Sequence, residues 1–204
     1  MATDADLLEA WREGDQRAGR ELFDRHYDGL YVFLRNKAGP NIDDLVQQTM
    51  TACVEGRDRI RGEFVHYLFG TARHLLYSDY RRRAANGDRE PDFGVTSACD
   101  LAPGVSSVVR AREEHQLLQT MLRRIGLDNQ VVIELHYMQG FRGPEIATIL
   151  DIPEGTVRSR LLRGLKQLRN LLEAHAVPTD EAKHARTTLE EWSADPLVAE
   201  PGPA

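Results

Sequence analysis

The sequence contains few of the residues on which secreted and metal-stabilised proteins depend. Its two cysteines, Cys53 and Cys99, are far apart and form no CxxC or Cys/His spacing, so neither a disulfide framework nor a zinc site is supported. Aromatic residues make up only 7% of the 204-residue chain. Leu, Ala, Arg and Glu are abundant instead, and they favour helices over strands. We therefore expect an all-α fold.

The sequence also has no apolar run long enough to cross a bilayer. Residues 1–11 lack the basic start and the apolar core of a signal peptide. We recognise no Ser/His/Asp or Cys/His constellation, no metal-ligand spacing and no phosphate-binding loop. These absences predict a cytoplasmic protein that does not insert into membranes. They also predict that it is not an enzyme and has no catalytic residues, metal ligands or cofactors.

The formal net charge of −6 argues at first against a nucleic-acid partner. The charge is unevenly spread, however. Residues 110–174 contain ten Arg or Lys against eight Asp or Glu, whereas residues 175–204 contain two against six. A basic surface on part of the chain is therefore compatible with the overall charge, and local charge is what steers DNA.

The spacing of apolar residues predicts two helical blocks. Thr3 or Asp4 can cap a first helix and Asp15 a second. The expected helices of the first block cover about residues 4–13, 15–37, 42–55 and 64–83. We expect one small domain over 1–84, a flexible linker over 85–109, a second small helical domain over 110–174, and an acidic, proline-containing tail over 175–204. We expect most of that tail to be disordered, although a short helix over 180–192 is conceivable.

Two single residues of the first block have a structural explanation. Cys53 falls on the predicted core face of the third helix, where a small buried thiol is expected rather than a redox sensor. Asp79 falls near the apolar face of the fourth helix, where a buried ion pair or a helix cap is expected.

The most informative segment lies between residues 139 and 169. Pro144 suits the first turn of a short helix, residues 151–153 (DIP) suit a tight turn, and a second helix is expected from about Glu154. The second helix has an apolar side, formed by Val157, Leu161, Leu165 and Leu168, and a basic side opposite. This pattern predicts a helix-turn-helix whose second helix enters the major groove of DNA.

The basic side of that helix supplies the DNA-contact candidates. The first turns of a recognition helix meet the base edges, so Arg158, Ser159 and Arg163 are expected to read bases. Four further residues suit phosphate contacts, namely Arg142, Thr156, Arg160 and Lys166.

Three motifs resemble those of extracytoplasmic-function (ECF) sigma factors, which are subunits of bacterial RNA polymerase. Residues 155–163 (GTVRSRLLR), preceded by 140–147 (GFRGPEIA), resemble the promoter-reading region 4 of that family. Residues 43–50 (DDLVQQTM) and 67–83 (YLFGTARHLLYSDYRRR) are similar to two segments of its region 2. The resemblance implies a region 2 helical bundle and a region 4 helix-turn-helix domain. It further implies that the chain binds core RNA polymerase, reads the minus-thirty-five element with region 4 and opens the minus-ten element with region 2.

The resemblance assigns roles to two faces of the first domain. The polar face of the third helix is expected to bind polymerase through Asp44, Gln47, Gln48 and Thr51. Aromatic and basic side chains interleave on the fourth helix and in the loop before it, and such a surface suits single-stranded DNA. The downstream-element candidates are Arg61, Tyr67, Arg73, His74, Tyr77 and Arg81.

Two departures from the family pattern suggest regulation. The family usually has an acidic residue at the position of Gln48, and Thr51 lies one turn away. One hypothesis is that a Ser/Thr kinase restores the missing negative charge by phosphorylating Thr51. A second hypothesis is that Glu190 and Glu191 of the tail, anchored by Trp192, cover the basic recognition helix. An anti-sigma factor is a further expected partner.

Other classes of protein remain open on the sequence alone. The helix-turn-helix would also fit a repressor or a response-regulator output module, although the first block has no receiver-like alternation of strands and helices. A helical interaction protein that binds no specific DNA is the third possibility.

Overall fold

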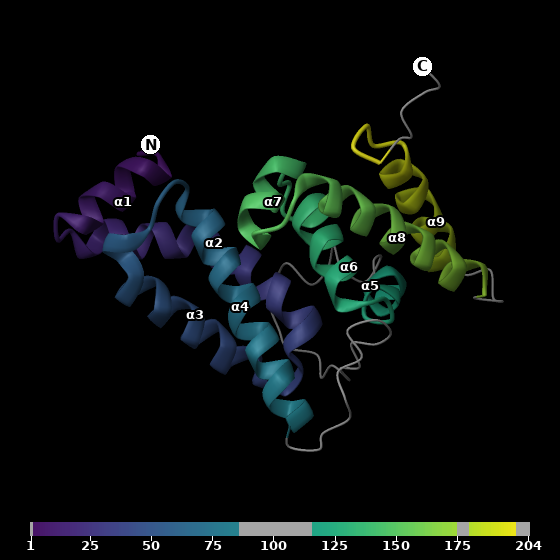
Figure 1. The fold of residues 1–204 in the computed structure, drawn as a ribbon, viewed down its shortest axis with the longest axis horizontal. Helices are drawn as coiled ribbons and strands as arrows, with labels where there is room; N and C mark the ends of the chain where they lie inside the picture. The colour runs from purple at the N-terminus through teal and green to yellow at the C-terminus, as the bar shows by residue number, and fades with distance from the viewer. Residues whose placement is uncertain (1, 86–115, 175–179, 199–204) are drawn as a thin grey trace. The chain divides into compact units, whose positions relative to one another are not determined.

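A computed structural model describes residues 2–85, 116–174 and 180–198, and every regular element in these ranges is helical. The elements of the first range are α1 (Asp4–Arg12), α2 (Gln16–Ala38), η1 (Gly39–Asn41), α3 (Ile42–Gly56), η2 (Arg57–Arg59) and α4 (Phe64–Ala85) (Figure 1). Those of the later ranges are α5 (Gln116–Leu122), α6 (Leu127–Ile133), η4 (Glu134–Met138), α7 (Gly143–Leu150), α8 (Glu154–Glu173) and α9 (Asp180–Ser193). The expected all-α fold is confirmed.

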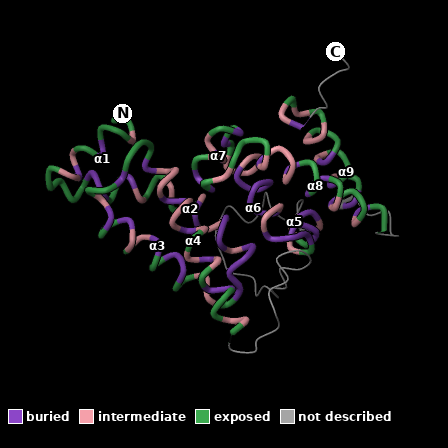
Figure 2. The backbone as a smooth tube through the Cα atoms, in the orientation of Figure 1, coloured by how far each residue is buried: buried purple, intermediate pink, exposed green. Residues whose placement is uncertain are grey.

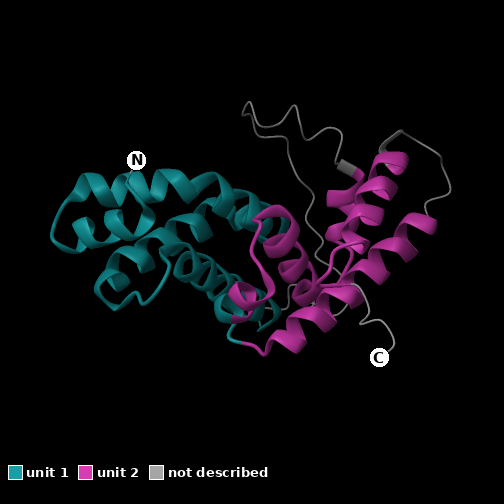
Figure 3. Ribbon diagram, turned by 90° about the horizontal axis from the view of Figure 1, so that it is seen from above, with its two compact units in different colours: residues 1–91, 148–151 teal, residues 92–147, 152–204 magenta. Residues whose placement is uncertain are grey.

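The chain divides into two compact units, coloured separately in Figure 3. The N-terminal unit consists of residues 1–91 with 148–151, and the C-terminal unit of residues 92–147 with 152–204. The linker expected over 85–109 lies almost wholly outside the described residues.

The ends of the first helices are set by the caps that the sequence suggests. The Thr3 side chain accepts a hydrogen bond from the Asp6 backbone N–H, and the Asp6 carboxylate accepts one from the Thr3 N–H at 2.8 Å, which forms a capping box. Asp15 accepts from the Arg17 N–H at 2.8 Å and begins α2. Between the two helices Gly14 has φ +108°, a conformation that favours glycine.

The core of the N-terminal unit contains a cluster of three aromatic rings and a separate aromatic pair. Trp11, Phe23 and Phe64 meet edge to face, with ring centroids 5.4 to 6.3 Å apart. Phe33 and Phe69 make a second edge-to-face contact at 5.3 Å between α2 and α4. Such pairs contribute about 0.5–1.5 kcal/mol each beyond the area they bury. Buried and exposed positions alternate along the helices of this unit (Figure 2), as helical amphipathicity requires.

A buried carboxylate joins α4 to the turn between α2 and α3. The Asp79 side chain is only 3% exposed and lies 2.6 Å from the guanidinium groups of Arg82 and Arg83. Asn41 donates to the same carboxylate at 3.3 Å, and Arg83 also donates to the carbonyl of Ala38 at 2.6 Å. The expectation of a buried ion pair at Asp79 is confirmed.

The core of the C-terminal unit depends on a close contact between α6 and α8. A Cβ atom placed on Gly164 would lie 2.5 Å from Cδ1 of Ile133 and 3.2 Å from Cβ of Asn129. A side chain at this position would therefore force Ile133 and Asn129 to shift. The unit is completed by α5 and α9, which contact α8 and each other.

The prediction that most of the tail is disordered is wrong for residues 180–198, whereas the short helix considered over 180–192 is present. Residues 180–193 form α9, and a further segment continues as far as Val198, which is only 5% exposed. The physical reason is an apolar stripe formed by Ala182, Ala185 and Leu189, each at most 6% exposed, which is buried when α9 packs on α5 and α8.

We predict that Asp79→Ala lowers the free energy of unfolding of the N-terminal unit by about 2–3 kcal/mol, because Arg83 and Asn41 lose their partly buried partner. Urea unfolding followed by Trp11 fluorescence in a Trp192→Phe background measures this change. The neighbouring exposed residue supplies the control, and Ser78→Ala is expected to change stability by no more than about 0.5 kcal/mol. Equal stability of the two variants would contradict the proposed role of Asp79.

Candidate nucleic-acid interface

The helix-turn-helix predicted from the sequence is present as α7 and α8. Between the two helices Asp151 adopts φ +52°, a left-handed conformation that aspartate tolerates better than most residues. The turn is closed by a hydrogen bond from the Ile152 N–H to the Ala147 carbonyl at 3.1 Å. Pro153 follows, and its carbonyl accepts from the Thr156 N–H at 2.8 Å in the first turn of α8.

The two sides of α8 match the expected pattern. The predicted inward residues are all at most 2% exposed, namely Val157, Leu161, Leu165 and Leu168. Arg163 and Lys166 are exposed, whereas Thr156, Arg158 and Ser159 are half-buried. The recognition helix is thus anchored along one side and leaves its basic side accessible.

Hydrogen bonds along α8 hold part of the proposed base-reading surface in place. The hydroxyl of Ser159 donates to the Thr156 carbonyl at 3.0 Å. Arg163 Nε donates to the Ser159 carbonyl at 3.1 Å, and a terminal nitrogen donates to the Ser159 hydroxyl at 3.3 Å. Arg163 therefore lies back along the helix, and it would exchange these bonds for contacts to DNA.

The two remaining phosphate candidates have different surroundings. Arg142 precedes α7, and its side chain is 83% exposed beside Glu145. Arg160, by contrast, has a side chain that is only 17% exposed and lies 2.6 Å from Asp128 of α6. Arg160 thus joins α6 to α8 within the domain, a contact between residues 32 positions apart that the local sequence pattern does not reveal.

In the N-terminal unit, α4 presents the interleaved rings and cations that the sequence suggested. The Arg73 guanidinium lies over the Tyr77 ring at 4.7 Å, and His74 and Arg81 are exposed. Arg61 is exposed in the loop before α4 and donates to the Asp58 carbonyl at 3.1 Å. Tyr67 has a structural role as well: a Cβ atom on Gly56 would lie 2.3 Å from its hydroxyl, so its ring packs against the end of α3.

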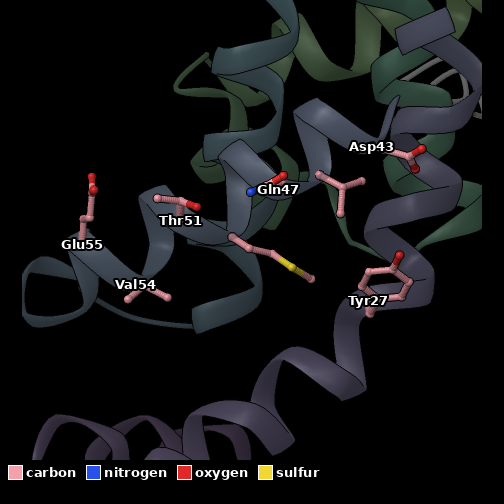
Figure 4. A pocket seen from close by; sticks show the side chains of 8 residues that line it. Tyr27, Asp43, Gln47, Thr51, Val54 and Glu55 are labelled. Carbon is pink, nitrogen blue, oxygen red and sulfur yellow. The ribbon is translucent and has the colours of Figure 1, made fainter. Parts of the chain in front are cut away.

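A groove of about 550 Å³ opens between α2 and α3 of the N-terminal unit (Figure 4). The predicted polymerase-binding residues Gln47 and Thr51 line one side of it, and Tyr27 of α2 faces them. Tyr27 and Val54 are unusually exposed for large apolar side chains, at 41% and 50%. Neither residue was predicted from the sequence. The spacing of Tyr27 and Tyr31, one turn apart on a polar stretch of α2, could have indicated an exposed aromatic surface.

The polar face of α3 beside this groove is exposed as predicted. Asp44, Gln47, Gln48 and Thr51 are all exposed, and Gln48 donates a hydrogen bond to the Asp44 carboxylate at 2.7 Å. On the opposite side of α3 Cys53 is fully buried, and burial raises the pKa of its thiol to about 12. Cys53 is therefore an unreactive core residue, as expected.

Each of the two units matches a known protein family model. The model of "Sigma-70 region 2" matches residues 22–86, and that of "Sigma-70, region 4" matches residues 115–168. The ECF RNA polymerase sigma-E factor of Haemophilus influenzae is 27% identical over 188 residues, which cover 84% of this chain and 96% of that protein. The protein of the same description from Escherichia coli K12 is 25% identical, with 84% and 95% covered.

Solved structures resemble this fold. CnrH, in complex with the cytosolic domain of CnrY, matches with a TM-score of 0.64 and 25% identity, over 85% of this chain and 99% of CnrH. The sigma factor RpoE of Bartonella quintana, in complex with the anti-sigma factor NepR, has a similar fold, with a TM-score of 0.61 and 22% identity over 76% of this chain and 97% of RpoE.

Region 2 and region 4 of a sigma-70 protein are thus both present, in that order. The chain belongs to the sigma-70 family of RNA polymerase subunits, as a member of its extracytoplasmic-function group. Within the described ranges no helix is both long and apolar enough to span a membrane, and no cluster of three His, Cys, Asp or Glu side chains could hold a metal ion.

We predict that Arg160→Ala lowers the free energy of unfolding of the C-terminal unit by about 1 kcal/mol, because Asp128 loses an ion-pair partner that is partly shielded from water. Urea unfolding followed by Trp192 fluorescence in a Trp11→Phe background measures the loss. Lys166→Ala removes a cation from the exposed side of the same helix and is expected to leave stability unchanged. If both variants are as stable as the parent, Arg160 does not act as an internal brace.

Proposed function

We propose that this protein binds core RNA polymerase and directs it to specific promoters, with α7 and α8 reading the upstream element and the N-terminal unit opening the downstream one. The observation that carries the proposal is the helix-turn-helix with an accessible basic side, in a chain that also contains region 2 of the same family. The protein performs no catalysis of its own on this proposal, and it acts in the cytoplasm, where polymerase and DNA are found.

Recognition of the upstream element is proposed to depend on the first turns of α8. Arg158, Ser159 and Arg163 are assigned to base edges, because a recognition helix presents its N-terminal residues in the major groove. Arg142, Thr156 and Lys166 are assigned to phosphates. Arg160 can reach a phosphate only by leaving Asp128, so we propose that its main role is to position α8.

Opening of the downstream element is proposed to use the surface of α4. A single strand can stack its bases on aromatic rings while cations follow its phosphates. Arg73 already lies over Tyr77, which offers a combined ring and cation surface of this kind. His74, Arg81 and Arg61 would extend the surface along the strand, and Tyr67 would contribute only the exposed part of its ring.

Polymerase binding is proposed to centre on the groove between α2 and α3. The groove combines the exposed apolar side chains of Tyr27 and Val54 with the polar residues Gln47 and Thr51. Asp44 and Gln48 are exposed on the polar face of α3. An apolar centre with a polar rim is the usual composition of a protein–protein interface. Acidic side chains at the rim would also guide approach to a basic partner.

Two kinds of regulator would act at these surfaces. An anti-sigma factor would compete for them; the sigma factor RpoE of Bartonella quintana forms a complex with the anti-sigma factor NepR. A Ser/Thr kinase would add charge at Thr51, which is exposed at the edge of the groove. The phosphate would compensate for the uncharged side chain of Gln48.

We predict that Arg158→Ala relaxes promoter choice, with about tenfold to hundredfold less discrimination at one position of the upstream element. DNA sequences selected by the reconstituted holoenzyme from a random library reveal this loss. Lys166→Ala is the matched control, because a phosphate contact carries no sequence information. It is expected to weaken binding of all sequences equally. It is also expected to reduce the slope of log affinity against log salt concentration by about 1, the contribution of one phosphate contact. Unchanged selection by Arg158→Ala would contradict the assignment.

We predict that the unmodified full-length protein binds core RNA polymerase, and that Gln48→Glu and Thr51→Glu each tighten this binding about fivefold by adding negative charge to the polar face of α3. Titration of a labelled protein with core polymerase measures both. Arg163→Ala, on the other unit, is expected to bind core polymerase as the parent does. Parent-like affinity of both acidic variants would eliminate the phosphorylation hypothesis, whereas absence of binding by every variant would contradict the polymerase-binding role.

A further inference from the structure

The described part of the chain continues well beyond the helix-turn-helix. The region 4 match ends at residue 168, and the Haemophilus influenzae relative is 96% covered by only 84% of this chain. Residues 180–193 nevertheless form α9, and its apolar stripe packs on α5 and α8. Arg169 of α8 donates a hydrogen bond to the Ser193 hydroxyl at the end of α9. The extension is thus a docked part of the C-terminal unit.

The end of α9 is anchored by aromatic and polar contacts to the segment before α7. The rings of Trp192 and Tyr137 stack with centroids 4.4 Å apart and planes 7° from parallel. The Tyr137 hydroxyl donates to the Trp192 carbonyl at 2.7 Å, and burial raises the pKa of that phenol. His136 adds a second connection, because its Nε2 lies 3.1 Å from the Asp195 carboxylate and its Nδ1 lies 2.7 Å from the Phe141 carbonyl.

Residues 195–198, which we call the strap, continue from this anchor to the start of α7. The strap is a tight turn: the Leu197 N–H donates to the Asp195 side chain at 2.7 Å, and the Val198 N–H to the Asp195 carbonyl at 2.9 Å. The two methyl carbons of Leu197 lie 3.2 and 3.3 Å from the position that a Cβ atom on Gly143 would occupy. Glu154 Oε1 lies 3.2 Å from the same position. The Leu197 side chain therefore covers the point where the first turn of α7 approaches the first turn of α8.

That point matters because of how a helix-turn-helix meets DNA. The second helix enters the major groove while the first crosses the sugar-phosphate backbone, and helix N-termini commonly contact phosphates. An apolar side chain over the first turn of α7, flanked by the carboxylates of Asp195 and Glu154, is incompatible with a phosphate at that place. Glu190 and Glu191, in contrast, are exposed on α9, and Trp192 is anchored on Tyr137 rather than on the basic side of α8.

We propose that the strap is an autoinhibitory latch that must leave the first turn of α7 before the helix-turn-helix can bind DNA. The inference rests on the proposed DNA-reading role of α7 and α8. When only a fraction of the molecules has the strap released, the apparent dissociation constant for DNA is the intrinsic constant divided by that fraction. Core polymerase, DNA or a third partner could then shift the chain to the released state. The inhibition differs from the electrostatic cover expected from Glu190 and Glu191, because it is steric and acts at α7.

The test measures binding of the free full-length protein to a fluorescent mixed-sequence DNA duplex at low salt, where phosphate contacts dominate affinity. Leu197→Ser removes the apolar cover without changing the charge. A second variant ends after Ala194, which removes the strap but keeps α9, because the Ala194 N–H still donates to the carbonyls of Glu190 and Glu191. Both variants are expected to bind about tenfold more tightly than the parent, a change of about 1.4 kcal/mol. Near-ultraviolet circular dichroism of the Tyr137–Trp192 stack verifies that α9 stays docked.

Three controls separate the possible failures. Thr187→Ala, on the exposed side of α9, and Glu190→Gln with Glu191→Gln are expected to change affinity by about twofold or less. A purely electrostatic cover predicts instead that the glutamine pair tightens binding and that Leu197→Ser does not. Arg163→Ala with Lys166→Ala is expected to abolish the gain when combined with Leu197→Ser. Parent-like affinity of both strap variants, with binding still dependent on Arg163 and Lys166, overturns the latch alone. Binding that does not depend on Arg163 and Lys166 overturns the DNA-reading role and the latch with it.

Discussion

The C-terminal unit depends on the close packing of one helix, because α8 is a core element on one side and, on the proposed function, a DNA-reading surface on the other. Because Gly164 has no side chain, α8 approaches α6 so closely that an added Cβ atom would lie only 2.5 Å from Cδ1 of Ile133. Arg160 and Asp128 hold the same two helices together on a neighbouring side. With its apolar side buried, α8 sets the spacing of Arg158, Ser159 and Arg163, the residues proposed to read bases.

In the N-terminal unit, two helices, α3 and α4, each combine a buried side with an exposed face. The aromatic core of this unit joins α1 and α2 to α4, and the Asp79 ion cluster joins α4 to the turn before α3. The groove beside α3 offers exposed apolar side chains within a polar rim, and α4 offers a ring with a cation above it. The proposed polymerase-binding and single-strand-binding surfaces therefore lie on separate helices of one small bundle.

Much of this architecture could be predicted from the sequence, because the relevant signals are local. Caps at Thr3 and Asp15, the turn at Asp151 and the apolar stripe of α8 all act within one or two helical turns. The features that could not be predicted depend on contacts between distant residues. Three features are of this kind: the ion pair of Arg160 with Asp128, the packing of Tyr67 on Gly56, and the groove that Tyr27 lines. The tail was misjudged for the same reason: its prolines and charges suggested disorder, whereas Ala182, Ala185 and Leu189 form a narrow stripe that becomes significant only against α5 and α8.

The central claim is that this chain changes where RNA polymerase begins transcription. The most direct measurement maps the 5′ ends of transcripts made by purified core polymerase on bacterial genomic DNA, with and without the protein. The account predicts new, discrete start sites that appear only with the protein and share an upstream and a downstream sequence element at constant spacing. A set of start sites that is the same with and without the protein would contradict it.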